Sequence, residues 1–504
     1  MVDVNELRSF FEKEVEVWDH PSMAVGIVKD GEVILNDAFG YADVENKRKA
    51  DADTMYMIGS CSKAFTAACA ALLVDRGLLE WDRPVHDYIP WLRFKDDFVT
   101  LNATTRDMLC HRTGLPRHDV SWIKGERNRK ETVENLKNMI PGWSFRSHWN
   151  YQNVCIVTVG YLIEVLTGMT WEEFVQKEIL DPLGMTRTTF WIDAMTADPN
   201  HAEPYGRPHP HVIKGLKKQE FLRGGTEDYE KRIGNEIGPA GSIVSTVNDM
   251  LKWVQFNLNN GKVGDKQLIS EENMKEIHSP QMLMEPLLIP LPETDFYSYG
   301  MGWFTETFRG HRLAEHGGNI TGFSALVTLL KDQNLGSVIL VNNNGARNTY
   351  SSSYHIMDQF LGITDGNWSE RFLEWQKKTQ EAAGSQMEKL FGKPVEGTVP
   401  SHPLEAYTGV YHNECYGDIT VTLEDGDLFM DFHHESSVLK HFHYDCFQLG
   451  SEESLLYEFV LQFLTEQKGK VDRIKFGIGL DPSLPDEIFT KVEEKKADEE
   501  KADE

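Results

Sequence analysis

Apolar and polar positions alternate at both ends of the first 365 residues, and this pattern predicts strands there. The segment SMAVGIVKDGEVILNDAFGYA (22–42) contains two β-like runs on either side of Asp30-Gly31, which predicts a hairpin. Between the two ends, the almost continuously apolar run VCIVTVGYLIEVL (154–166) predicts a buried helix that ends at Thr167-Gly168. The stretch 196–235 is rich in Pro, Gly, His and charge and predicts long loops.

The second half of this region is predicted to contain a helix, then three strands, then another helix. A helix is expected to restart in AGSIVSTVNDMLKWVQFNL, where Thr246 and Asp249 have the spacing of a capping box. Three strand-like runs follow, HRLAEHGG, SALVTLLKD and SVILVNN, and then the helix-like TYSSSYHIMDQFL. Strands at both ends with helices between them predict an α+β domain over 1–365. We expect an antiparallel sheet closed by the two ends, flanked by helices, with a helical subdomain.

After Gly366 the pattern changes. A polar helical stretch predicts a linker helix over 366–394, and short, evenly spaced strands over 395–490 predict a separate small all-β barrel or sandwich. These strands are expected in YTGVYHN, DITVTLEDGDLFMDFHH, HFHYDCFQL, LLYEFVLQFLTE and VDRIKFGIG. The residues 491–504 are charged, lack aromatic side chains and predict a disordered acidic tail.

Composition and charge narrow the classes of function. The 504 residues include 40% hydrophobic residues, enough for a large core, and the formal net charge of -28 disfavours nucleic acid and anionic membranes as partners. No run of about 18 apolar residues occurs, and the N-terminus lacks the features of a secretory signal. Six scattered cysteines without a CxxC motif fit reduced thiols, so we expect a cytoplasmic protein.

The chemistry begins in MIGSCSKAFTAACAALL, where Ser60 and Lys63 stand three residues apart at the start of an apolar run. Side chains at this spacing share one face of a helix, and the free N–H groups at a helix start stabilise negative charge. A lysine desolvated by apolar neighbours could take the serine proton, which is an arrangement for covalent acyl transfer. We expect Cys61, between them, to be a small buried hydrophobe.

Two further segments fit the same chemistry. Tyr151 and Asn153 stand at the head of the predicted buried helix, where a tyrosine could pass a proton to a leaving group and an amide could hold a substrate carbonyl. His316-Gly317-Gly318-Asn319 lies on the first of the three late strands, and its glycines allow a ligand backbone to approach closely. The N–H of Asn319 could complete an oxyanion hole.

Together these motifs resemble the serine β-lactamase and penicillin-binding-protein superfamily, in its class C-like branch of DD-peptidases, D-aminopeptidases, esterases and lactamase-like hydrolases. The resemblance covers about residues 5–365 and extends to phrases such as TTRDMLCHRTGLP, ILDPLGMTRTTF and PAGSIVSTVNDMLKW. The C-terminal part resembles the lipocalin-like barrel that follows many of these hydrolases.

The resemblance implies a role for each motif residue. Ser60 would be the acylated nucleophile, Lys63 and Tyr151 would share acid and base work, and Asn153 would bind substrate. The strand His316-Gly317-Gly318-Asn319 would line the substrate site, with the N–H groups of Ser60 and Asn319 as the oxyanion hole.

His316 replaces a lysine that many β-lactamases carry, which puts efficient β-lactam hydrolysis in doubt. An ordinary histidine would titrate between about pH 6 and 8, so we expect His316, if it lies in the cleft, to change substrate choice with pH. The chemistry needs no cofactor and no metal.

The sequence therefore predicts a serine hydrolase that acts through an acyl-enzyme on a small peptide, amide or ester. Two alternatives stay open at this point: an acyltransferase that uses the same acyl-enzyme, and a catalytically weak ligand-binding or scaffold protein. The expected partner is a small-molecule or short-peptide substrate, and assembly into a homo-oligomer is left open.

Overall fold

The computed structural model describes residues 2–123, 127–206, 216–219, 237–286, 289–451, 456, 458–478 and 486–493. The chain forms two compact units. Unit 1 contains residues 1–117 and 124–382, and unit 2 contains residues 118–123 and 383–504. The long-loop prediction for 196–235 falls largely outside the described residues, as does the predicted tail beyond 493.

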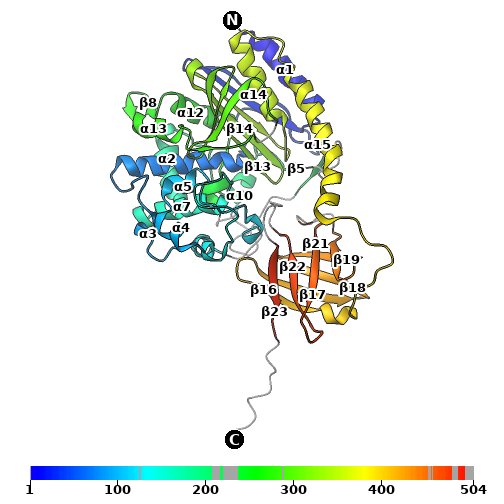
Figure 1. The fold of residues 1–504 in the computed structure, drawn as a ribbon. Coiled ribbons are helices and arrows are strands. Elements are labelled where there is room, and N and C mark those ends of the chain that lie inside the picture. The colour runs from blue at the N-terminus through cyan, green and yellow to red at the C-terminus, as the bar shows by residue number, and fades with distance from the viewer. Residues whose placement is uncertain are drawn as a thin grey trace. The chain divides into compact units, whose positions relative to one another are not determined.

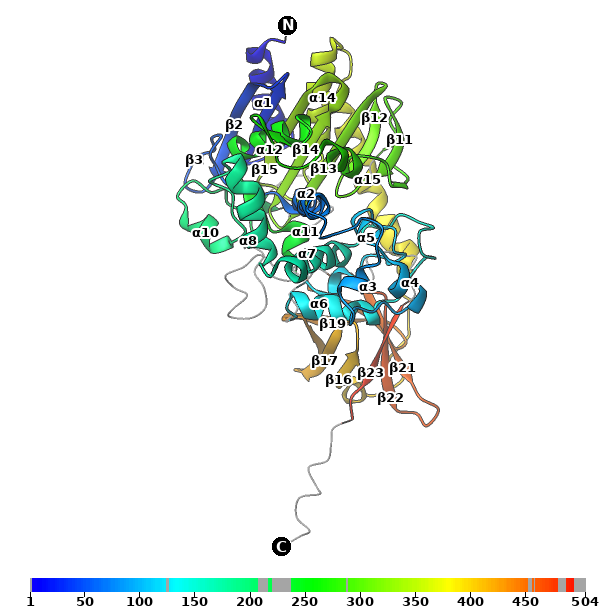
Figure 2. The ribbon, with the colours of Figure 1, turned by 90° about the vertical axis from the view of Figure 1, so that its left-hand side faces the viewer.

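Unit 1 is built on a nine-stranded sheet in the order β10-β11-β12-β13-β14-β15-β1-β2-β3 (Figures 1 and 2). The N-terminal strand β1 pairs antiparallel with β15, so the two ends of the domain close the sheet as the sequence predicts. The strands are β1 Ser22–Lys29, β2 Glu32–Asp43, β3 Arg48–Lys49, β10 Met282–Leu283, β11 Thr294–Tyr299, β12 Phe304–Phe308, β13 His311–Ile320, β14 Phe323–Leu330 and β15 Leu335–Val341.

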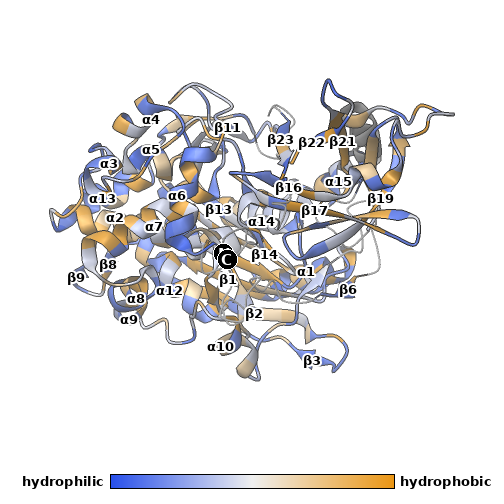
Figure 3. Ribbon diagram, turned by 90° about the horizontal axis from the view of Figure 1, so that it is seen from below, coloured by the Kyte–Doolittle hydropathy of each residue, from blue (hydrophilic) through white to orange (hydrophobic). Residues whose placement is uncertain are grey.

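Alternating side chains of the central strands enter two different cores. Val25 faces a cluster that includes residues of α1 (Val4–Val17), α14 (Asn348–Leu361) and the start of α15 (Trp368–Phe391). Gly26 faces the other side, where an added Cβ would lie 2.7 Å from Leu251 Cδ2 on α12 (Val247–Leu258). Because both faces are covered, the central strands are apolar along much of their length, as Figure 3 shows for β1 and β14.

The helical part of unit 1 lies between β2 and β11 in sequence and surrounds α2 (Ser62–Asp75) and α7 (Asn153–Thr167). The remaining helices are α3 Val85–Tyr88, α4 Asp97–Asn102, α5 Thr105–Leu109, α6 Arg129–Glu134, α8 Trp171–Val175, α9 Asp181–Leu183, α10 Ile192–Ala197, α11 Gly238–Gly241 and α13 Glu271–Ile277. Three small two-stranded sheets pair β4 Tyr56–Met57 with β7 Val244–Ser245, β5 Tyr205–Gly206 with β6 Lys217–Lys218, and β8 Lys262–Val263 with β9 Lys266–Gln267.

Several local predictions are confirmed. The Asp30-Gly31 hairpin joins β1 to β2, and α7 ends at Gly168, whose φ of 70° is the left-handed cap expected there. Thr246 caps α12 by accepting a hydrogen bond from the Asp249 N–H, but the Asp249 carboxylate bonds to Arg187, Thr188 and Lys252 instead of returning to the cap. The expected capping box is therefore half formed.

No single helix in the described part of the chain has both the length and the hydropathy to span a membrane. One bent pair, Asn153–Thr167 with Trp171–Leu183, passes the same test by length and composition. Most residues of Asn153–Thr167 are buried against protein, as a core helix requires.

Unit 2 contains a closed eight-stranded antiparallel barrel in which β23 pairs with β16 (Figure 1). The strands are β16 Gly409–Asn413, β17 Gly417–Glu424, β18 Asp427–Phe432, β19 Glu435–His443, β20 Cys446–Leu449, β21 Val460–Thr465, β22 Val471–Phe476 and β23 Glu487–Lys491. Buried aromatic side chains pack together in it, among them Tyr407, Tyr411, Phe447 and Phe463. The predicted α+β fold with an all-β barrel at its C-terminal end is confirmed.

A six-residue strip of unit 2, residues 118–123, comes from far earlier in the chain. The His118 ring hydrogen-bonds to the Tyr416 hydroxyl at 2.7 Å, and the His433 ring Nδ1 donates to the Ile123 carbonyl at 2.9 Å. Both His118 and Tyr416 are about 1% exposed. The barrel unit therefore includes a segment that the sequence pattern had assigned to the domain before it.

Candidate active site

Ser60 lies in a tight turn whose conformation depends on the glycine before it. It belongs to a single 3₁₀ turn, Gly59–Cys61, that leads directly into α2. Gly59 has a φ of 50°, a conformation that glycine adopts without the steric cost that a side chain would bring. The turn places the Ser60 hydroxyl at the mouth of a helix, where backbone N–H groups have no helical partners.

Lys63 is the only lysine among the largest fully buried side chains of the described residues, with 0% exposure. Its Nζ donates to Ser60 Oγ at 2.9 Å and to the Ala240 carbonyl oxygen at 2.7 Å. Ala240 belongs to α11, which also receives a 2.7 Å hydrogen bond from Thr66 to the Pro239 carbonyl. The ammonium group is therefore fixed between a backbone carbonyl and the serine, rather than extended to solvent.

Tyr151 and Asn153 stand at the start of α7, as the sequence predicts. The Lys63 Nζ lies 4.8 Å from the centre of the Tyr151 ring, so Ser60, Lys63 and Tyr151 meet at one place. Asn153 is the first residue of α7 and is 6% exposed. The N-cap residue Gln152 accepts a hydrogen bond from the Val154 N–H at 3.0 Å, which fixes the end of the helix from which Tyr151 extends.

His316 lies in a buried aromatic setting on β13. Its Nδ1 is 2.7 Å from the Gly317 carbonyl, which can only accept, so Nδ1 carries the proton. Nε2 then accepts from the Tyr299 hydroxyl at 2.9 Å. Burial, helped by the positive charge of Lys63, lowers the pKa of His316 to about 3. The expectation that His316 titrates between about pH 6 and 8 is therefore wrong, because the sequence does not reveal how deeply this ring is buried.

A pH experiment tests the neutral state of His316. Since the ring is already neutral above about pH 4, we expect the ratio of kcat/KM for a carboxylate-bearing substrate to that for its methyl ester to stay level from about pH 5.5 to 8.5. A ratio that falls as the pH rises would show that His316 is protonated and recognises the carboxylate.

Two backbone amides approach each other where β13 passes the Ser60 turn. A Cβ placed on Gly318 would lie 1.9 Å from the Ile58 carbonyl oxygen and 3.1 Å from the Ser60 amide nitrogen. A Cβ placed on Gly59 would lie 3.0 Å from the Asn319 amide nitrogen. The absence of side chains at both glycines therefore lets β13 and the Ser60 turn approach closely, as an oxyanion hole made of the Ser60 and Asn319 amides would require.

Gly318→Ala tests this close approach. The new methyl group would collide with the Ile58 backbone and push β13 away from the Ser60 turn. We expect kcat for a nitrophenyl ester to fall by roughly 10²–10³, the usual loss when one oxyanion donor is removed.

Gly317→Ala is the matched control for that variant, because its methyl group would meet the Tyr350 hydroxyl on the other side of β13, at 2.6 Å. The end of a side chain can move where a backbone carbonyl cannot, so the loss of kcat should be much smaller. Equal losses in the two variants would contradict the assignment of the oxyanion site.

The structure adds residues to the site that the motifs did not indicate. The His111 ring packs against Tyr151, with ring centres 4.4 Å apart, and its Nδ1 accepts a hydrogen bond from the Gln152 N–H at 3.2 Å. The guanidinium of Arg117 lies 5.3 Å from the Tyr151 ring centre. Burial, with the nearby charge of Lys63, lowers the pKa of His111 well below its usual value, so this ring is neutral as well.

Cys61 does not compete with Ser60 as a nucleophile. Its thiol is 1% exposed and donates to the His316 carbonyl at 3.1 Å. Burial raises the pKa of the thiol to about 12, so the reactive thiolate is scarce at neutral pH. The predicted buried role of Cys61 fits this environment. Among the described residues, no group of three or more His, Cys, Asp or Glu side chains could hold a metal ion.

Known proteins share this fold and sequence pattern. The octameric penicillin-binding protein homologue from Pyrococcus abyssi aligns with a TM-score of 0.60 and 19% identity, over 97% of this chain and 100% of that one. A class C beta lactamase from Rhodobacter sphaeroides aligns with a TM-score of 0.55 and 20% identity, over 71% of this chain and 99% of that one. The fold is therefore that of β-lactamases and penicillin-binding proteins.

The sequence matches extend this result to a family. The Beta-lactamase family matches residues 7–357, and a domain of unknown function (DUF3471) matches residues 393–491. Unguisins hydrolase ungD of Aspergillus violaceofuscus is 27% identical over 84% of this chain and 78% of its own length. Protein flp of Staphylococcus aureus is 24% identical over 67% of this chain and 63% of its own length. This chain belongs to the Beta-lactamase family, which confirms the resemblance seen in its motifs.

Proposed function

We propose that the protein is a serine hydrolase that cleaves a small peptide, amide or ester through a covalent acyl-enzyme. The observation that carries the proposal is the 2.9 Å contact between a fully buried lysine and a serine at a helix mouth. A buried cation is costly unless the surrounding groups stabilise it, and here Nζ donates to the serine and to a backbone carbonyl. Membership in the Beta-lactamase family, together with similarity to a protein named as a hydrolase, supports the proposal.

The geometry supports the following order of events. Lys63, when neutral, accepts the Ser60 proton as Ser60 Oγ attacks the substrate carbonyl carbon, and the Ser60 and Asn319 amides hold the resulting oxyanion. The carbonyl then re-forms as the bond to the amine or alcohol breaks, and that group leaves with a proton supplied from Lys63 or Tyr151. Water attacks the acyl-serine in the reverse sense and releases the acid.

We propose that the substrates are peptides, amides or esters rather than β-lactams. A neutral His316 stands where many β-lactamases have a lysine, so the described strand β13 does not supply a fixed charge at that position. The exposed guanidinium of Arg117, over Tyr151, is a positive charge at the site that the motifs did not reveal. The cytoplasmic location and the assembly into a homo-oligomer stay predictions, the second with an octameric structural relative.

Intact-mass spectrometry tests the acyl-enzyme directly. The full chain is incubated briefly with nitrophenyl esters, D- and L-aminoacyl anilides, and β-lactams, and we expect a mass increase equal to the acyl group for at least one ester or anilide. Cys61→Ala should acquire the same mass, because that thiol is buried and protonated. An adduct that is lost in Cys61→Ala but kept in Ser60→Ala would contradict a serine acyl-enzyme. Adding an alcohol or amine and analysing the products separates hydrolysis from acyl transfer.

A further inference from the structure

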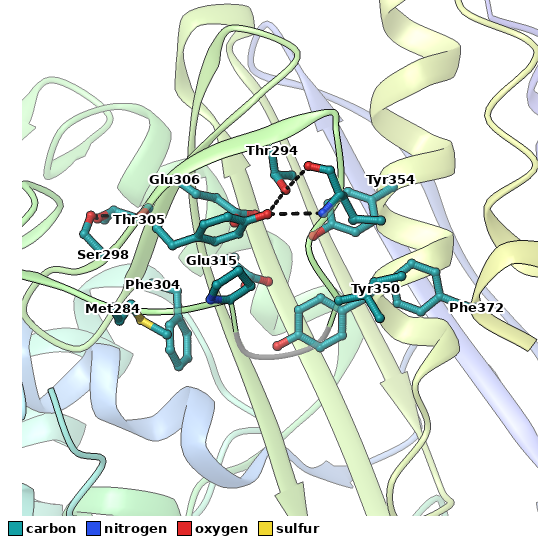
Figure 4. A pocket seen from close by; sticks show the side chains of 14 residues that line it. Met284, Thr294, Ser298, Phe304, Thr305, Glu306, Glu315, Tyr350, Tyr354 and Phe372 are labelled. Atoms are coloured by element: carbon teal, nitrogen blue, oxygen red, sulfur yellow. Dashed lines mark hydrogen bonds between the residues drawn. The ribbon is translucent and has the colours of Figure 1, made fainter. Parts of the chain in front are cut away.

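A second cavity lies in unit 1 on the face of the sheet that α14 and α15 cover (Figure 4). Its volume is about 30 Å³, which is room for one or two groups the size of a water molecule. Its walls are largely aromatic and aliphatic, and two carboxyl groups, Glu306 on β12 and Glu315 on β13, line it. Its lining, as far as the structure describes it, contains no lysine, arginine or histidine.

This cavity is separate from the Ser60 site. Neighbouring residues of β13 point to opposite faces of the sheet. Gly318 faces the Ser60 turn, whereas Gly317 faces the Tyr350 hydroxyl, which lines the cavity. The cavity therefore lies behind the strand that carries His316, and none of its lining residues belongs to the Ser60 machinery.

The two carboxyl groups lack the partners that buried acids normally have. Glu315 is 6% exposed, and no hydrogen bond or ion pair reaches its carboxyl group from any described residue. The carboxyl group of Glu306 has one hydrogen bond, from the Tyr354 side chain, whereas its Oε1 is buried without a hydrogen-bond partner. Burying a carboxylate that has no positive partner costs several kcal/mol, so a cavity lined by these two acids suits a positive ligand or protons.

We propose that this cavity binds a primary ammonium group, either the ammonium ion or a small alkylamine. An ammonium group has N–H donors for the Glu306 and Glu315 carboxylates and for the Tyr350 hydroxyl oxygen. The aromatic rings of Phe304 and Tyr350 line the cavity, and a cation that lies over the face of such a ring is attracted to it. A divalent metal fits less well, because only two acidic ligands line the cavity and no third His, Cys, Asp or Glu joins them within the described chain.

Protons compete with the amine for the two carboxyl groups. The affinity for the amine should therefore depend on pH. Burial raises the pKa of both carboxyl groups, and for Glu315 the neighbouring Glu306 raises it further. The facing groups from the other elements are Tyr297 on β11 and Tyr350 and Tyr354 on α14, with Arg347 just before α14. Burial also raises the pKa of Tyr350 and Tyr354, so they stay neutral. Bound amine must displace protons from the acids, so its affinity should increase from about pH 6 to 9.

Equilibrium dialysis of the full chain with radiolabelled methylamine tests the proposal in the wild-type protein. We expect saturable binding at one site per chain, tighter at about pH 9 than at about pH 6, and competition by ammonium chloride but not by potassium chloride at the same ionic strength. Potassium has the same charge but no N–H donors. Absence of saturable binding, or equal competition by potassium, would overturn the proposal.

Substitutions locate the site. Glu315→Gln and Glu306→Gln keep the size of the side chain and remove the charge, and each should weaken methylamine binding at least tenfold. Glu14→Gln is the matched control, because Glu14 is another acid of unit 1, 3% exposed, that bonds to Ser369. It should bind methylamine as the wild type does. Unchanged binding in both Glu306→Gln and Glu315→Gln, or equal weakening in Glu14→Gln, would show that the cavity is not the site. The wild-type dialysis result holds even if a variant fails to fold.

Discussion

Ser60→Ala should abolish turnover and leave the fold intact. The substitution removes the atom that forms the acyl bond, and the loss in kcat for a nucleophile of this kind is on the order of 10⁴–10⁶. The substitution removes the hydrogen bond from Lys63 Nζ to the Ser60 hydroxyl, but Lys63 keeps its bond to the Ala240 carbonyl, so the structural cost should be small. Steady-state kinetics with the best ester or anilide, together with circular dichroism, measure both effects.

The labelling of the variant provides an independent check. A serine-directed fluorophosphonate should modify the wild type and fail to modify Ser60→Ala. If the variant retained more than about a tenth of the wild-type rate, another residue would be the nucleophile. Loss of the folded circular dichroism spectrum would instead show that Ser60 is needed for structure, and the thermal unfolding curve distinguishes these outcomes.

Lys63→Met should be nearly as damaging as the loss of the serine. Methionine has about the length of lysine and suits a site that is 0% exposed, so it removes the amine while filling the space. We expect kcat to fall by about 10²–10⁴, the usual contribution of a positioned general base. Because Ser60 and Lys63 act as a unit, the double variant Ser60→Ala, Lys63→Met should be little slower than Ser60→Ala alone.

Lys331→Met is the matched control for Lys63→Met. Lys331 is a second largely buried lysine of unit 1, and its Nζ lies 3.0 Å from the His278 ring, away from the site. The wild-type rate should be retained in this variant. Additive losses in the double variant, or an equal loss in Lys331→Met, would mean that Lys63 acts through stability and not through proton transfer.

The sequence pattern predicted those helices and hairpins that depend on neighbouring residues alone. The Asp30-Gly31 hairpin and the apolar α7 with its terminal glycine can be read from neighbouring residues, and both are present. The barrel was predicted from five strand-like stretches, but of its eight strands one was foreseen only in its last residues, 441–443, and one was not foreseen at all. These are β19, which starts with the polar Glu435–Ser437, and β23, and each is recognised only by the strands it pairs with.

The active site likewise contains residues that the motifs predicted and residues that only the folded structure reveals. Ser60, Lys63 and Tyr151 come together as their spacing and the family resemblance predicted. The Ala240 carbonyl and the Tyr299 hydroxyl were missed because they act through contacts across 177 and 17 residues of sequence, with no motif of their own. The titration of His316 was predicted wrongly because a pKa depends on burial, which a single histidine in a sequence does not reveal.

The helix predicted as a linker over 366–394 is packed differently from a linker. A helix, α15, runs over Trp368–Phe391, but Trp368 and Phe372 are buried in the core cluster of unit 1. Arg371 pairs with Glu293 at 2.9 Å, and Ser369 donates to Glu14 at 3.0 Å. The start of this helix is therefore part of the first domain, because its apolar face covers the sheet.

The strip 118–123 has a consequence for how such a protein can be rearranged. Because it belongs to unit 2 while the chain on both sides of it belongs to unit 1, the polypeptide changes unit three times, after residues 117, 123 and 382. A gene fusion or exchange made at the last junction alone would transfer a barrel without the six residues that complete it, leaving Tyr416 without its His118 partner. Recombination between relatives should therefore succeed only when residues 118–123 and the barrel segment after residue 382 are exchanged together. The two domains should then be inherited as one unit, although their cores are separate.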